Sequence, residues 1–307
     1  MSLQAPSAVV MIRPHHFRSN PETRADNAFQ TGATGPGVAA RARAEFDAVV
    51  TALRGSGVTV HVFDDTGTDT PDSVFPNNWF STHAGGHVAL YPMYSENRRR
   101  ERRMDVIEML KRDYRVQDVI DYSGLEADGL ALEGTGAMVL DHVGRVAYVA
   151  KSNRADPVAL ERFCTHFNYE PIAFDARDAA GREVYHTNVL MGIGTDYALV
   201  GLDMIADPAR RATVRARLEE SGHEVIALSQ DQIGRFAGNA FEMTGRAGRI
   251  LALSQTALDA LTPDQVAAIT RSARMLPVSI PTIETAGGSV RCMIAGIHLS
   301  PRQGPLT

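Results

Sequence analysis

The chain repeats one pattern five times: an amphipathic helical stretch, a short strand rich in β-branched residues and, in most copies, a hairpin. The helical and strand stretches are 37–55 and 58–63, 96–114 and 116–120, 156–167 and 171–174, 208–221 and 224–228, and 262–274 and 277–280. Hairpin turns are indicated by Gly85-Gly86, His142-Val143-Gly144, Gly194-Thr195-Asp196 and Gly245-Arg246-Ala247-Gly248, and the fifth hairpin ends the chain. Such self-similarity at one period is typical of a repeat architecture.

The residues at which the five hairpins begin set the period. They are Asn78, Gly136, Asn188, Asn239 and Cys292, spaced by 51 to 58 residues. Units of this size cannot bury their own apolar faces, but five of them can share a core by closing in a ring, with the first strand, 8–12, completing the last unit. We therefore expect one closed α/β domain over residues 1–307. In such a ring the equivalent loops of all units open at the same end of the central axis.

Composition restricts the class of protein. The hydrophobic fraction of 44% and the charged fraction of 22% are ordinary for a soluble globular protein, and a formal charge of -5 disfavours nucleic acid or an anionic membrane as the main partner. The N-terminal stretch contains no apolar signal or spanning segment, and two cysteines, Cys164 and Cys292, do not make a disulfide framework. We expect a reduced, cytoplasmic protein in which Cys164 is buried on a helix and inert.

Reactive side chains gather where the hairpins begin. Cys292 follows Gly287-Gly288, a pair that lets the backbone turn tightly beside a ligand, and begins an apolar segment that we expect to be a strand. His186 in the third unit is the candidate that activates the thiol, and Glu133 in the second is the candidate carboxylate. Taken singly, the cysteine also fits a small core hydrophobe, and the other two fit loop residues satisfied by water or backbone. Their equivalent positions in different units favour one shared site.

At these motifs the sequence resembles the guanidino-group-modifying superfamily, which includes arginine deiminase, dimethylarginine dimethylaminohydrolase and the amidinotransferases. The resemblance runs from about residue 11 to residue 299 and is closest to the citrulline-utilisation hydrolase branch. It rests on 287–293 (GGSVRCM), 72–75 (DSVF), 132–134 (LEG), His186 and 151–154 (KSNR), which occur in the family's order. It implies a five-bladed ββαβ propeller, the pentein fold, with pseudo-fivefold symmetry.

The resemblance also implies a role for each site residue. Cys292 becomes the nucleophile, His186 the general acid and base, and Glu133 the carboxylate that binds substrate nitrogen. This agrees with the chemistry, because a polarisable thiolate and an imidazole divide a difficult displacement at a guanidino or ureido carbon into two easier steps. The residues expected to bind substrate are Asp72, Asn78, Asn188, Arg98, Arg154 and Asn239.

The two arginines are assigned to a carboxylate on the substrate, with solvent as the alternative partner. Solvent is a strong alternative for Arg98, because it begins the charge run 98–103. The loop after the first strand, with His15, His16 and Asn20, is a candidate cover for the site, although polar loops are usually surface.

Two positions depart from the pattern of members that bind cationic guanidines. Asn78 and Asn188 stand where those members commonly have aspartates, so a buried cation would be left largely uncompensated. Amides suit the neutral ureido group of citrulline, which offers both an acceptor and donors. We therefore predict a cysteine hydrolase of linear C–N bonds that prefers citrulline and yields ornithine, carbon dioxide and ammonia through a thioester-type intermediate on Cys292.

Several alternatives remain open. An arginine deiminase, a dimethylarginine-type hydrolase or an amidinotransferase would use the same residues, the last with an amine in place of water as acceptor. The same propeller also serves as a non-catalytic binding module, which the joint presence of Cys292, His186 and Glu133 disfavours. No cofactor is expected, and no metal, because none of the ten histidines falls in a zinc-ligand spacing. The expected partner is a small amino-acid substrate, and a homo-oligomer is compatible with the sequence.

Overall fold

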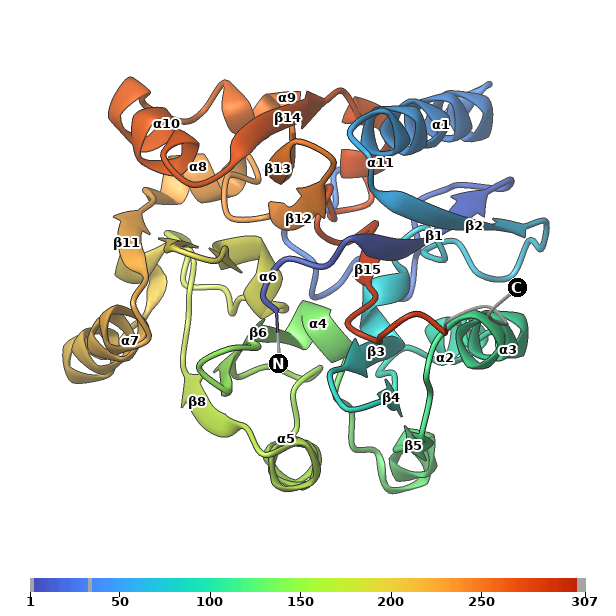
Figure 1. The fold of residues 1–307 in the computed structure, drawn as a ribbon, viewed down its shortest axis with the longest axis horizontal. Coiled ribbons are helices and arrows are strands. Elements are labelled where there is room, and N and C mark those ends of the chain that lie inside the picture. The colour runs from blue at the N-terminus through green and yellow to red at the C-terminus, as the bar shows by residue number, and fades with distance from the viewer. Residues whose placement is uncertain (1–2, 33–34, 303–307) are drawn as a thin grey trace.

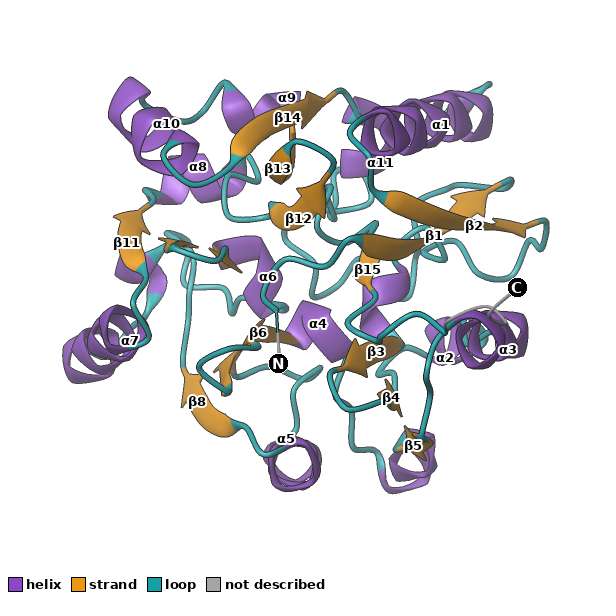
Figure 2. Cartoon of the chain, in the orientation of Figure 1, coloured by secondary structure: helices purple, strands orange, loops and turns teal. Residues whose placement is uncertain are grey.

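Five small three-stranded sheets, with the longer helices outside them, make up the computed structural model, which describes residues 3–32 and 35–302 (Figures 1 and 2). The sheets are β15–β1–β2 (Ala295–Gly296, Ala8–Pro14, Thr59–Asp65), β3–β4–β5 (Phe80–His83, His87–Leu90, Asp118–Asp121), β6–β7–β8 (Met138–Asp141, Val146–Ala150, Glu170–Phe174), β9–β10–β11 (Met191–Ile193, Tyr197–Val200, Glu224–Ala227) and β12–β13–β14 (Phe241–Gly245, Gly248–Ser254, Arg274–Val278). In each, one strand pair is antiparallel and the other is parallel. The predicted fivefold repetition of helix and strands is confirmed at this level.

The longest helix of each unit lies at the periphery (Figure 1). These helices are α1 (Val38–Gly55), α3 (Met104–Asp113), α5 (Pro157–Phe167), α7 (Pro208–Glu220) and α10 (Pro263–Thr270). Three of them begin where the sequence places a capping residue before proline: the side chains of Asp156, Asp207 and Thr262 accept hydrogen bonds from backbone N–H groups of the first turn. Proline fits the first helical position because its missing N–H would have no partner there.

The first sheet joins the two ends of the described chain. The central strand β1 pairs in parallel with β2 and antiparallel with β15, so the prediction that the first strand completes the last unit is confirmed. The fifth hairpin is therefore not made of consecutive strands. The other four hairpins have their turns at the predicted positions.

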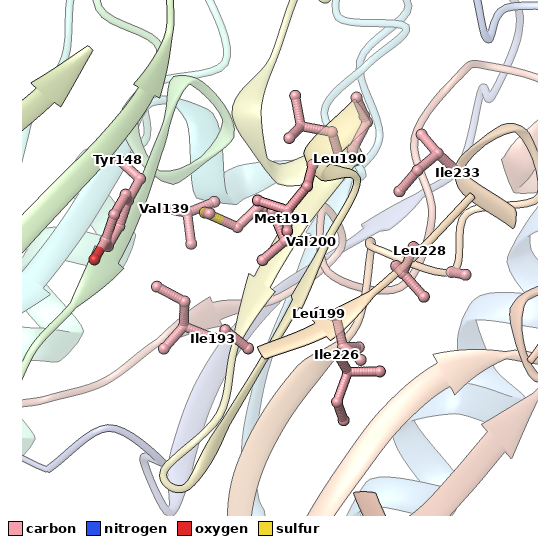
Figure 3. Close-up of a cluster of buried hydrophobic side chains, with 14 of the residues drawn as sticks. Val139, Tyr148, Leu190, Met191, Ile193, Leu199, Val200, Ile226, Leu228 and Ile233 are labelled. Atoms are coloured by element: carbon pink, nitrogen blue, oxygen red, sulfur yellow. The ribbon is translucent and has the colours of Figure 1, made fainter. Parts of the chain in front are cut away.

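Buried side chains connect each sheet to its neighbours. On β1, Val9 and Met11 pack with the fifth sheet, whereas Val10 and Ile12 pack with the second, since alternate residues of a strand face opposite sides. A third cluster joins the second and third sheets, and the largest, part of which is shown in Figure 3, joins the third, fourth and fifth. The core is thus a series of clusters between adjacent sheets.

Three expectations about local structure are wrong. The helical stretch 96–114 is two helices, α2 (Glu96–Arg99) and α3, with a break at 100–103. The last predicted strand begins earlier than expected, at Arg274, and Cys292 lies in a turn before β15 instead of in a strand.

None of the helices in the described ranges combines the length and the apolar character needed to cross a bilayer.

Candidate active site

Short helical turns precede the hairpins and bring the units together. They are η1 (Pro76–Asn78), α4 (Gly134–Ala137) and α6 (Thr187–Leu190), and the last two lie near the middle of the view in Figure 1. Gly136 shows how closely they approach: a Cβ atom there would lie 2.1 Å from the Asn78 amide and 2.8 Å from His186 Nδ1. Only glycine fits at this point, where the first, second and third hairpins meet.

Glu133 is the centre of a buried polar network. Its Oε2 lies 2.8 Å from His186 Nε2, 3.3 Å from Arg154 Nη1 and 3.5 Å from Arg98 Nη1. Its other oxygen, Oε1, accepts the backbone N–H of Tyr94 at 3.1 Å. Glu133 has no solvent exposure, so these donors replace the water that a carboxylate otherwise requires. The network joins the third sheet to the second and fourth sheets.

The protonation states follow from this environment. Burial alone would raise the pKa of Glu133, but the charge of Arg154, the hydrogen bond from His186 and the charge of Arg98 hold that pKa below its usual range. Burial lowers the pKa of His186 to about 4, against the opposing effect of Glu133. Glu133 is therefore ionised and His186 neutral at pH 7. Because a carboxylate only accepts, the imidazole carries its proton on Nε2 and keeps its other nitrogen free as a base.

Each arginine has a second carboxylate partner. Arg98 donates from Nε and Nη2 to Glu101 at 2.9 Å each, and Arg154 donates to both oxygens of Asp26 at 3.0 and 2.7 Å. Both guanidinium groups are almost fully buried, so the solvent alternative for Arg98 does not hold. In the orientation that satisfies both ends of its amide, Asn78 also accepts both terminal N–H groups of Arg98, at 3.0 Å. A substrate carboxylate would thus have to compete with carboxylates of the protein.

The thiol of Cys292 receives two amide donors. Asn188 Nδ2 and Asn239 Nδ2 each lie 3.3 Å from Sγ. The orientation of the Asn239 amide is fixed, because Nδ2 also donates to the Asn188 carbonyl at 2.8 Å and Oδ1 accepts the N–H of Arg291 at 3.1 Å. Gly288 packs beside Cys292, and a Cβ atom at Gly288 would lie 2.8 Å from the ring of Phe75. The two N–H groups can stabilise negative charge on sulfur.

Cys292 and His186 line the same cavity, which also borders Asp72, Asn78, Arg98 and Arg154. Its volume is only about 10 Å³, room for about one water molecule. No hydrogen bond joins His186 to Cys292 within the described part of the chain, which is compatible with catalytic contacts that form only when substrate binds. Glu133 lies behind His186.

The loop after β1 covers this cavity. Asn20 and Thr23 donate to the buried Asp72 at 2.8 and 3.3 Å, and Asn27 donates to the Ala286 carbonyl at 3.3 Å. The cavity is too small for an amino acid, so one of its walls must move before an amino acid can bind. The sequence singled out Asn20 in the loop but missed Asp26 and Asn27, which have no local motif.

The pairing of Arg98 with Glu101 could have been predicted from the sequence, because Glu101 lies three residues after Arg98 and on the same side of the turn.

No group of three or more His, Cys, Asp or Glu side chains within residues 3–32 and 35–302 is arranged to hold a metal.

We expect Asn239→Ala to slow the alkylation of Cys292 by iodoacetamide about tenfold, because a lost hydrogen bond to a charged group costs about 1.5 kcal/mol. Mass spectrometry of the native protein would give the rate. Asn153→Ala, which removes an exposed asparagine, should leave the rate unchanged. Cys164 should stay unlabelled, because burial raises the pKa of its thiol to about 12. Equal rates in wild type and Asn239→Ala would show that the amide contact does not activate the sulfur.

We also expect the wild type to lose stability relative to His186→Gln as the pH falls. Unfolded histidine takes up a proton near pH 6.5, whereas folded His186 does so only near pH 4, so between these values the unfolded chain binds more protons. The relative loss should reach about 3 kcal/mol at pH 4 and should be absent above pH 7. Urea unfolding of both proteins from pH 4 to 8 measures it. A difference independent of pH would contradict a neutral His186.

Comparison with known proteins identifies a family for the chain. The family model described as N,N dimethylarginine dimethylhydrolase, eukaryotic, matches residues 13–299. A search of curated proteins finds no match.

Solved structures share the fold at low sequence identity. The N-terminal domain of ArgZ, from an arginine dihydrolase of the ornithine-ammonia cycle in cyanobacteria, has a TM-score of 0.74 with a covalent reaction intermediate bound, at 15% identity over 94% of this chain and 96% of that chain. Unliganded AgrE gives 0.75 at 17% identity, over 96% of this chain and 40% of AgrE. A dimethylarginine dimethylaminohydrolase adduct gives 0.65 at 14% identity, over 96% of this chain and 99% of that chain.

Proposed function

Because the chain belongs to the N,N-dimethylarginine dimethylhydrolase family and is a hydrolase of non-peptide C–N bonds, we propose that it cleaves the guanidino group of a small amino acid such as arginine or a methylated arginine. One observation carries the proposal: Cys292 and a neutral His186 border one cavity, with ionised Glu133 hydrogen-bonded to His186. Nucleophile, base and orienting carboxylate come from three different units. A binding module needs no such arrangement.

The proposed reaction has two steps. The free nitrogen of His186 takes the thiol proton, the Cys292 thiolate attacks the guanidino carbon, and the C–N bond to the leaving amine breaks as His186 returns the proton to it. Water, deprotonated by His186, then attacks the carbon and the C–S bond breaks, which releases a ureido product and restores the thiol. Glu133 holds the imidazole in place and stabilises its positive charge in both steps.

The substrate class depends on whether the carbon that Cys292 attacks belongs to a guanidino or a ureido group. ArgZ is described as an arginine dihydrolase, and the matching family is described by dimethylarginine, so both favour a guanidino substrate over the ureido substrate that the sequence predicted. A ureido group such as that of citrulline is the second candidate. The neutral side chains of Asn78 and Asn188 favour it, since they offer no anion to a cation. An amidinotransferase would resolve the same intermediate with an amine.

Substrate-binding residues are proposed from the cavity. Arg98 and Arg154 would exchange Glu101 and Asp26 for the substrate carboxylate, and Asp72 would bind its ammonium group.

The proposed architecture is a closed five-bladed propeller with pseudo-fivefold symmetry in one domain. The cluster shared by the first and fifth sheets supports that closure.

An ammonia-release assay over arginine, asymmetric dimethylarginine, citrulline and agmatine tests the proposal. We expect arginine or the methylated arginine to be the best substrate and agmatine, which lacks the carboxylate, to be poor. Cys292→Ser should lower kcat at least about a thousandfold with the fold intact by circular dichroism, whereas Cys164→Ser should retain activity. Full activity in Cys292→Ser would refute the mechanism, and faster release from citrulline would select the ureido candidate.

We expect Asn188→Asp to shift kcat/KM toward arginine relative to citrulline by about ten- to a hundredfold, because a charge-assisted hydrogen bond adds about 1.5–3 kcal/mol. Asn78→Asp is the matched comparison and should shift specificity less, since Arg98 would neutralise the new charge. Steady-state kinetics of both variants on both substrates give the ratio. An equal shift in the two variants would contradict this difference between the two amides.

A further inference from the structure

A second cavity lies directly beside the catalytic one. Its volume is about 460 Å³, within the range of small-molecule sites. Tyr185 lines both cavities, and two short stretches of chain divide them: Asn27 and Ala286 face the catalytic cavity, whereas their neighbours Ala28 and Thr285 face the second. The mechanism proposed above uses no residue that lines this larger cavity.

The walls of the second cavity are apolar and aromatic. Phe29 packs on Tyr185 and Phe236, with ring centroids 6.3 and 5.5 Å apart, and Met204 and Ile233 complete the apolar surface. Phe236 has a φ of 62°, a conformation that a bulky side chain rarely adopts and that clusters at ligand sites. An aromatic or aliphatic group of a ligand fits such walls.

Four carboxylates line the cavity, and three of them already have partners in the protein. Asp178 pairs with Arg182 at 2.7 Å and Glu183 with Arg177 at 2.9 Å, whereas the buried Glu284 accepts hydrogen bonds from Thr256 and Ser289. Asp231 has no ion-pair partner among the residues that the structure describes. The charge that complements the unpaired Asp231 is positive.

A buried acceptor beside Asp231 also lacks a donor. Gln230 Oε1 is buried and accepts no hydrogen bond within the described chain, although buried acceptors are normally satisfied. Gln230 lines the cavity next to Asp231. If the Gln230 side chain turns this oxygen toward the cavity, a ligand with several N–H groups would satisfy the amide oxygen and the neighbouring carboxylate together.

The cavity wall is connected to the nucleophile. The carbonyl of Phe236 accepts the backbone N–H of Asn239 at 2.8 Å, and the side chain of Asn239 donates to Cys292. A ligand that packs on Phe236 therefore contacts the residue that holds Asn239 in place.

From these observations we propose that the second cavity binds a small organic amine, with the ammonium group at Gln230 and Asp231 and an apolar or aromatic body on Phe29, Tyr185 and Phe236. The site is distinct from the catalytic cavity and does not depend on the substrate proposed above. The bound amine would lie on the other side of the wall that separates this cavity from Cys292.

Isothermal titration calorimetry on the full chain tests the chemistry with three ligands of one shape: phenethylamine, 2-phenylethanol and 3-phenylpropionate. Phenethylamine should bind, the neutral alcohol should bind several-fold more weakly, and the anion should not bind. Asp231→Asn should weaken phenethylamine about two- to fivefold, as expected for one exposed charge pair. Asp264→Asn, an exposed aspartate also in the first turn of a helix, should change nothing. Phe29→Ala should weaken all binding through the lost aromatic wall.

Repeating the titration after Cys292 is blocked with iodoacetamide separates this site from the catalytic one. Binding should persist in the blocked protein. The proposal is overturned if blocking abolishes binding, if the anion binds as well as the amine, if phenethylamine does not bind, or if Asp231→Asn binds it like wild type. A protein without activity on any guanidino or ureido compound that still binds phenethylamine at Asp231 would refute the proposed function and leave this site standing.

Discussion

The candidate site depends on the interactions of the buried Glu133 carboxylate with the positively charged and hydrogen-bonding groups around it. A carboxylate without solvent is stable only if charged donors surround it, and here His186 and two arginines from different units meet at one of its oxygens. Removing one partner from such a group costs about 3–5 kcal/mol, because the remaining charges stay buried and unpaired. The same contacts that fix the imidazole therefore also tie together the second, third and fourth sheets.

Much of the fold could be predicted because its information is local. The change from helical to strand periodicity marks each unit, and Asp-Pro or Thr-Pro marks where outer helices begin. The predictions that were wrong concern segments whose structure depends on contacts with residues far away in the sequence. The stretch 96–114 breaks at 100–103, where Arg102 pairs with Glu126 of a later segment. Cys292 leaves the strand pattern because the glycine turn before it packs against Phe75.

The site divides in the same way. Cys292, His186 and Glu133 could be found because each stands in a short motif near the start of a hairpin. Asp26 and Asn27 could not, since their positions follow from how the loop after β1 folds over the cavity. The sequence also assigned Asn239 to substrate, whereas the structure places its amide on the sulfur of Cys292. Whether it contacts substrate as well stays a prediction.

The pairing of β1 with β15 has a consequence for how the protein is made. Strand β1 leaves the ribosome early, but one of its edges has no partner until β15, near the other end of the described chain, has been synthesised. An unpaired edge on an apolar strand invites association with other chains during that time. The turn that carries Cys292 lies just before β15, so this side chain is positioned only when this slow, long-range closure is complete. Partly synthesised chains therefore lack the contacts that surround the Cys292 thiol in the folded protein.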